Sequence, residues 1–122
     1  MSKTILIIDD SASVRQVAGI ALKAAGYNVV EAVDGDEALA RLAGQKVHLI
    51  VSDYDMPNRN GLAFVDELKK LSAYKFIPIV MLTSEARKIK PSKDSIDSVK
   101  AWIVKPFQPA QMLAAITKLI LP

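Results

Sequence analysis

The sequence predicts an α/β fold in which a parallel sheet carries helices on both faces. Short apolar runs of strand length alternate along the chain with longer segments whose apolar residues recur at helical spacing. The connections between these segments are short, and most of the strand-like runs are apolar throughout, which is typical of parallel strands buried on both faces. The chain has 122 residues, which is the length of one domain with a core of its own.

Five segments are predicted as strands. Four of them are nearly continuous apolar runs, and the second in chain order alternates more, as expected for a strand at the edge of a sheet. His48 interrupts the third run and is expected to pack near the sheet without taking part in chemistry. In chain order the strands are Thr4–Ile8, Tyr27–Ala32, Val47–Val51, Pro78–Leu82 and Trp102–Val104.

Helices are predicted between the strands, and residues that favour helix ends mark their limits. The first helix can be capped by Ser11 or Ser13, and Gly26 is suited to end it. Pro109 is suited to the first position of the last helix. The other boundaries are Asp34 and Gly44 for the second helix, and Gly61 and Leu71 for the third.

The composition excludes several classes of protein. The chain has no cysteine, so it can form neither disulfides nor thiolate metal sites. Its apolar runs are shorter than the roughly 18 residues of a membrane span, and its N-terminus has no signal-peptide core, so we expect a cytoplasmic protein. The net charge of +3 is small and the basic residues are scattered outside residues 87–93, which argues against nucleic acid binding.

Polar side chains follow four of the predicted strands at the point where each strand ends. The carboxyl ends of parallel strands meet at one edge of a sheet, so these side chains are expected to converge in one crevice. Gathered carboxylates repel one another unless a cation joins them, and oxygen ligands of this kind suit Mg²⁺. The residues are Asp9 and Asp10, then Asp53 and Asp55, then Thr83 and Ser84, and finally Lys105.

Asp53 is predicted to be a nucleophile that accepts a phosphoryl group, with its carboxylate exposed at the end of its strand. The carboxylates of Asp9 and Asp10 would join it in holding the magnesium ion. Lys105 would supply a fixed positive charge to Asp53 or to a phosphoryl oxygen. The hydroxyl of Thr83 would bind a phosphoryl oxygen.

Several short motifs occur in a fixed order along the chain, and they cover essentially its whole length. They are Asp9-Asp10, Asp53 with Met56-Pro57 and Gly61, Thr83, and Lys105-Pro106-Phe107. Together they resemble a response-regulator receiver domain, and in particular a stand-alone CheY-like chemotaxis regulator. The resemblance implies a flavodoxin-like, doubly wound sheet of five strands in the order 2-1-3-4-5, as in flavodoxin and CheY, with five helices. It also implies a single receiver domain over residues 1–122, with no output domain.

The resemblance implies a role for each carboxylate. Asp53 would take its phosphoryl group from a CheA-like histidine kinase in a two-component signalling pathway. Asp10 would bind Mg²⁺ directly, Asp9 through a water molecule, and Asp55 through its backbone carbonyl.

It also implies a switch that turns over no substrate other than its own phosphoryl group. Thr83 and Trp102 would move on phosphorylation, and the Lys105–Pro106 peptide bond would be cis. The altered protein would bind a downstream protein through the face formed by its fourth helix, fifth strand and fifth helix. It would act as a monomer, and a separate phosphatase could reset it.

One segment departs from this family. Residues 87–99 contain Pro91, three serines and clustered charge, where the family usually has an alanine-rich fourth helix. Because proline inside a helix costs roughly 3 kcal/mol, the sequence predicts a short helix that begins at or after Pro91, or a mobile segment. This departure leaves open a pseudo-receiver that folds but does not switch. A phosphatase of the haloacid-dehalogenase type also uses an Asp-x-Asp nucleophile, matched by residues 53–55, but its strand order is different.

Overall fold

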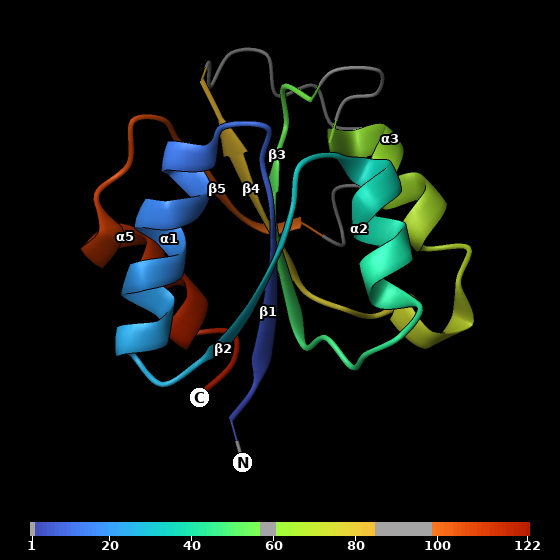
Figure 1. Cartoon of the computed structure of the whole chain (residues 1–122), viewed down its shortest axis with the longest axis horizontal. Coiled ribbons are helices and arrows are strands. Elements are labelled where there is room, and N and C mark those ends of the chain that lie inside the picture. Colours follow the sequence, from blue (N-terminus) through green and yellow to red (C-terminus); the bar gives the residue numbers. More distant parts are fainter. Residues whose placement is uncertain (1, 57–60, 85–98) are drawn as a thin grey trace.

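The computed structural model of the chain describes residues 2–56, 61–84 and 99–122. These residues form a five-stranded sheet in the order β2-β1-β3-β4-β5, in which every neighbouring pair is parallel (Figure 1). The predicted architecture and strand order are therefore confirmed. Most of the predicted fourth helix lies outside the described residues, and Val99, which we had placed in it, begins β5 instead.

Three strands lie within one residue of the predicted runs, whereas β3 begins and ends two residues later than predicted and β5 begins three residues earlier. Every residue of β3 and β4 is buried, whereas β2, at the edge of the sheet, is largely exposed or half-buried. The strands are β1 (Thr4–Ile8), β2 (Asn28–Ala32), β3 (Leu49–Asp53), β4 (Ile79–Thr83) and β5 (Val99–Val104).

Among the described residues, helices cover both faces of the sheet (Figure 1). The helices α1 (Ala12–Ala24) and α5 (Pro109–Thr117) lie on one face, and α2 (Gly35–Leu42) and α3 (Gly61–Leu68) lie on the other. A hydrophobic core lies between the sheet and the helices on each face. Successive strand residues alternate between these two cores, because side chains along a strand point to opposite faces. Within the part of the chain described above, none of the helices combines the length and the apolar character needed to cross a membrane.

The helix ends confirm the predicted capping residues. The hydroxyl of Ser11 accepts a hydrogen bond from the backbone N–H of Val14, at 3.3 Å, at the start of α1. Gly26 follows the end of that helix with a φ of 101°, a conformation that glycine adopts without strain. Asp34 caps α2 by accepting a bond from the N–H of Glu37 at 2.8 Å. These contacts fix where the chain leaves and re-enters the sheet.

The third helix is shorter than predicted. It ends at Leu68, a 3₁₀ turn follows at Ser72–Tyr74, and Leu71 is 44% exposed instead of belonging to the apolar stripe. The ammonium group of Lys69 donates hydrogen bonds across this turn, to the carbonyl oxygen of Lys75 at 2.8 Å and to that of Ile77 at 3.1 Å. These bonds hold the chain in a loop where the apolar spacing alone predicts another helical turn.

His48 directly precedes β3, and its Nδ1 atom accepts a hydrogen bond from the backbone N–H of Thr4 at 3.0 Å. Only an unprotonated Nδ1 can accept this bond. Burial, together with the nearby charges of Lys46 and Lys3, lowers the pKa of His48 below its usual value of 6.5. The folded protein therefore favours the neutral imidazole.

This arrangement predicts that the domain loses stability in mildly acidic solution. Below pH 6.5 the unfolded chain binds a proton at His48 more readily than the folded protein does. The free energy of unfolding is therefore undiminished by this proton above pH 6.5 and falls as the pH decreases below it. Urea unfolding at about pH 7.5 and about pH 5.5 measures the loss. The His48→Asn variant should lose less, because an amide does not titrate. An equal loss in both proteins would assign it to other groups.

Candidate functional site

Three carboxylates lie together at the edge of the sheet where the parallel strands end. Asp9 and Asp10 follow β1, Asp53 is the last residue of β3, and one oxygen from each lies within 4.8 Å of the others. Asp9 is 0% exposed and Asp53 is 2% exposed, so the expectation of an exposed Asp53 carboxylate is wrong. The reason is that β3 is the central strand, and a side chain from beyond β5 closes over its end.

That side chain belongs to Lys105, which binds two of the three carboxylates. Its Nζ atom lies 2.7 Å from Oδ2 of Asp9 and 3.1 Å from Oδ1 of Asp53. The backbone N–H of Lys105 also donates to the carbonyl oxygen of Thr83 at 2.7 Å, which ties the segment after β5 to the end of β4. The Lys105–Pro106 peptide bond is cis, as predicted. The predicted contact with Asp53 is present, and the shorter one with Asp9 was not predicted.

The electrostatics of the site reflect this close packing of charge. Burial raises the pKa of the Asp53 carboxyl, the neighbouring Asp9 raises it further, and Lys105 offsets part of the rise. Burial alone would lower the pKa of Lys105, but its contacts with Asp9 and Asp53 outweigh burial and raise it. The lysine is therefore held as a cation. The ionised form of the Asp53 carboxyl is disfavoured by its surroundings, and a further cation beside it would reduce that cost.

Asp9 is held by the start of α1 as well as by the lysine. The backbone N–H of Ser11 donates to its Oδ1 atom at 2.9 Å. The Arg15 guanidinium donates to the backbone carbonyl of Asp9 at 2.7 Å and bridges to Glu31 of β2 at 3.2 Å. Sequence reasoning missed Arg15, because a lone arginine on a helix carries no signal that it reaches back to the preceding loop.

Asp55 and Thr83 lie beside the cluster. The N–H of Asp55 donates to Oδ1 of Asp53 at 3.1 Å, while its own carboxylate accepts a hydrogen bond from the Ser84 hydroxyl at 2.9 Å. The carboxylate of Asp55 is thus not among the three that gather. Thr83 is the last residue of β4 and is fully buried.

Trp102 of β5 is half-buried and packs against the core. Its ring lies 6.1 Å from that of Tyr54, measured between centroids, at an interplanar angle of 56°. Since Tyr54 directly follows Asp53, this contact joins β5 to the segment at the end of β3.

Gly61 has a role that its place in the sequence motif did not explain. It begins α3, and its backbone N–H donates to the carbonyl oxygen of Tyr54 at 2.8 Å. A Cβ atom added to it would lie 2.8 Å from the carbonyl oxygen of Asp53 and 2.7 Å from Sδ of Met81. The helix can approach the end of β3 this closely only because residue 61 has no side chain.

The donor set of the cluster fits a magnesium ion. Three carboxylates and the ammonium group of Lys105 leave two negative charges, which is the charge that one divalent cation balances. All of the donors are oxygen atoms, which Mg²⁺ prefers, and the exposed Asp10 leaves room for the water ligands that Mg²⁺ retains.

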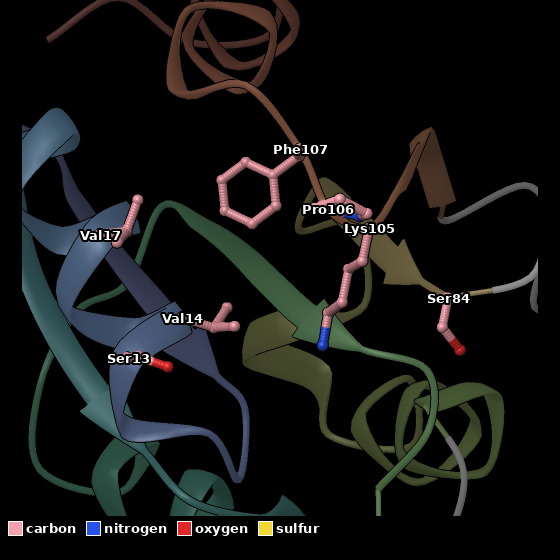
Figure 2. A pocket seen from close by; sticks show the side chains of 7 residues that line it. All are labelled: Ser13, Val14, Val17, Ser84, Lys105, Pro106 and Phe107. Carbon is pink, nitrogen blue, oxygen red and sulfur yellow. The ribbon is translucent and has the colours of Figure 1, made fainter.

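An apolar groove of about 460 Å³ borders the site (Figure 2). Phe107, beyond β5, and Val14 and Val17 of α1 lie on its two sides, and Lys105 reaches from its edge toward the end of β3. Val17 is 46% exposed. The groove gives a partner an apolar surface directly beside the carboxylates.

Comparison with known proteins places the chain among signalling receivers. The pattern of the response regulator receiver domain matches residues 5–117, and the chain belongs to that family. It is a receiver domain of the two-component response regulators. The family has the flavodoxin-like CheY fold found here, and its acidic pocket is the place where receiver domains bind Mg²⁺.

Three relatives are informative. The chain is 34% identical to the protein PilG of Pseudomonas aeruginosa, over 92% of this chain and 83% of that protein. The chemotaxis response regulator CheY4 of Vibrio cholerae has a structure with a TM-score of 0.90 and 38% identity, covering 98% of this chain and 100% of that chain. The structure of TrrA of Thermotoga maritima, solved in complex with Mg²⁺ and BeF, has a TM-score of 0.83 and 28% identity, covering 97% of this chain and 99% of that chain.

Other relatives are longer than the chain. The match spans about half the length of the phosphate regulon transcriptional regulatory proteins named PhoB. For the PhoB of Pseudomonas aeruginosa, it covers 50% of that protein. Membership of the receiver family decides against the haloacid-dehalogenase alternative, whose nucleophile would lie on the first strand.

Proposed function

We propose that this protein is a phosphorylation switch in which Asp53 accepts a phosphoryl group from the phosphohistidine of a histidine kinase. The observation that carries the proposal is the position of the Asp53 carboxylate, which lies at the end of the central strand among two further carboxylates and a lysine. This combination supports the proposal, because it would bring a nucleophile, charge-balancing groups and a cation site into one crevice.

The transfer requires little from the protein beyond position and charge. A carboxylate oxygen of Asp53 forms a bond to phosphorus as the bond between phosphorus and the donor imidazole nitrogen breaks. The electron pair of the broken bond stays on that nitrogen, which then takes up a proton. Asp9, Asp10 and Asp53 would hold Mg²⁺, with the backbone carbonyl of Asp55 as a further ligand. The ion supplies positive charge that offsets repulsion between the carboxylates and the phosphoryl oxygens.

Two side chains would read the phosphoryl group once it is attached. Lys105 already contacts Asp53 and could exchange that contact for a phosphoryl oxygen. Thr83 ends the neighbouring strand and would offer its hydroxyl to another oxygen. Movement of either would change the surface around β5, where Trp102 contacts Tyr54.

The partners follow from this chemistry and from the relatives. The kinase would approach the exposed side of the cluster, with its apolar side chains in the groove between Phe107 and α1. The chemotaxis name of CheY4 supports a target in a chemotaxis-type pathway. We expect the protein to act as one receiver domain, without turnover of a separate substrate.

The deciding experiment is incubation with Mg²⁺ and acetyl phosphate, or with beryllofluoride, followed by intact-mass measurement. One phosphoryl group, located at Asp53 by peptide mapping, supports the proposal. Absence of any adduct would favour the pseudo-receiver that folds but does not switch. Steady release of phosphate from unrelated esters would indicate a phosphatase instead.

Magnesium binding gives a second test. The Asp10→Ala variant should bind Mg²⁺ more weakly, because it loses one of the three gathered carboxylates. It should also unfold at a higher urea concentration in metal-free buffer, since one repulsive charge is gone. Titration calorimetry measures the affinity, with Asp66→Ala on α3 as the matched control. An Mg²⁺ affinity equal to that of the parent protein would remove Asp10 from the site.

A further inference from the structure

A second cavity lies at the opposite edge of the sheet from Asp53. It has a volume of about 580 Å³ and lies between the C-terminal end of α2 and the loop after α3, two segments that lead into the starts of β3 and β4 (Figure 1). Leu39 and Leu42 line it from α2, and Leu71 and Tyr74 line it from the loop. We call this cavity the basal cleft.

Hydrogen bonds join the two walls of the basal cleft. The hydroxyl group of Tyr74 lies 2.9 Å from the carbonyl oxygen of Leu42 and 3.0 Å from that of Gln45, and its proton is donated to this pair of acceptors. The Lys69 bonds to the carbonyls of Lys75 and Ile77 hold the loop in its folded path. A cleft with fixed walls loses little conformational entropy when it is filled, which favours binding.

The loop that forms one wall of the cleft exposes large apolar side chains. Leu71 is 44% exposed, and Phe76 is 87% exposed in the same loop. The ammonium group of Lys75 lies 5.6 Å from the centroid of the Phe76 ring. An exposed aromatic residue on a loop that lines an apolar cavity is characteristic of a surface that binds another protein.

The two loops that border the cleft carry charge of one sign. The loops that border it, residues 43–48 and 69–78, contain four lysines and no acidic residue. The nearby Lys3 and Lys46 lower the pKa of His48, after the effect of burial. Burial and then Lys100 lower the pKa of Lys69 in the same way. The positive charge of this edge therefore extends beyond the two loops, in a protein whose net charge is only +3.

We propose that the basal cleft docks an amphipathic acidic segment of a partner protein, with apolar side chains in the cavity and carboxylates facing the lysines. An anionic membrane or a nucleic acid would use the lysines but would need no apolar cavity. Because the cleft and Asp53 lie at opposite edges of the sheet, the partner stays bound whether or not Asp53 carries a phosphoryl group. The inference is independent of the phosphoryl transfer proposed above.

The test uses the full chain labelled with ¹⁵N and a peptide of about 14 residues, long enough to form a helix when bound. The peptide carries leucines at helical spacing with glutamates beside them, and a matched control peptide carries lysines in place of the glutamates. The acidic peptide should shift the amide signals of residues 39–45 and 71–76, and added salt should weaken its binding. Equal binding of the basic peptide, or shifts confined to the groove beside Phe107, would overturn the proposal.

Variants separate the apolar and the charged contributions. Leu71→Ser should weaken the acidic peptide about tenfold, which corresponds to the loss of one buried leucine. Lys75→Glu should weaken it by reversing a charge, and Tyr74→Phe should weaken it by loosening the walls. Ile20→Ser is the matched control, because Ile20 is 63% exposed on α1 at another face. If Leu71→Ser binds the peptide as well as the control does, the cleft is not the site.

Three further measurements exclude other occupants. If sedimentation shows that the protein is a dimer and that the Leu71→Ser variant is a monomer, a second copy of the chain fills the cleft. If the protein binds phosphatidylglycerol vesicles or duplex DNA in preference to the acidic peptide, the ligand of this edge is an anionic membrane or a nucleic acid. Peptide affinity that changes severalfold when Mg²⁺ and beryllofluoride are added would overturn the independence from Asp53. The proposal requires a monomer, preference for the peptide, and unchanged affinity.

Discussion

Replacing Asp53 with asparagine is expected to abolish phosphoryl labelling while leaving the fold intact. Asparagine has nearly the same shape, but its amide is not a nucleophile toward phosphorus. Its carbonyl oxygen can still accept the hydrogen bond that the Asp55 N–H now donates to Asp53. Labelling by acetyl phosphate with Mg²⁺, followed by intact-mass measurement, gives the result directly.

The same variant also tests the electrostatics of the buried site. Burial and Asp9 raise the pKa of the Asp53 carboxyl, so its ionised form opposes folding at neutral pH. The neutral amide removes this opposition, and in magnesium-free buffer the variant should be at least as stable as the parent protein. Asp66→Asn, on α3, is the control that should keep full labelling. Labelling of the Asp53 variant at the parent rate would assign the acceptor to another residue.

Replacing Lys105 with methionine is expected to destabilise the protein by about 3 kcal/mol without magnesium. This figure is at the lower end of the range for removing one partner of a buried ion pair, because the lysine side chain is itself 20% exposed. The change leaves the fully buried Asp9 and the nearly buried Asp53 without their shared cation. Urea unfolding with and without Mg²⁺ measures the effect, and saturating Mg²⁺ should restore part of the loss by linkage.

The lysine variant should also separate phosphoryl transfer from switching. If Lys105 reads the phosphoryl oxygen, its loss should reduce the gain in affinity for a target more than it reduces the yield of labelling. Lys118→Met, at the end of α5, is the matched control. Equal stability of the Lys105 and Lys118 variants in metal-free buffer would show that the ion pair is dispensable.

The fold could be predicted from the sequence because its main signals are periodic. The buried strands read as apolar runs, the helices as stripes with capping residues, and the edge strand as an alternating pattern. The convergence of Asp9, Asp53, Thr83 and Lys105 followed from one geometric rule, that parallel strands end at the same edge. The strand order itself came from the resemblance to receiver domains, since periodicity does not fix which strands are neighbours.

The features that were missed depend on contacts between distant side chains and the backbone. The bond of Arg15 to the carbonyl of Asp9 and the bonds of Lys69 across its loop leave no periodic trace in the sequence. The burial of Asp53 was missed because Lys105, 52 residues later, covers it. The shortened α3 has the same origin, since apolar spacing predicts a further turn where Lys69 fixes a loop.

The close approach of Gly61 to the end of β3 limits what a list of chemically reactive residues can reveal about a related chain. A single methyl group at position 61 would meet the carbonyl oxygen of Asp53 at 2.8 Å, and a contact this short forces the backbone to move. Such a chain would keep every carboxylate, the lysine and the threonine, and would still hold the carboxylate of residue 53 in a different place. If Asp53 accepts a phosphoryl group as proposed, competence for the transfer is encoded partly by the absence of a side chain, and a search that scores only reactive groups would accept inactive relatives.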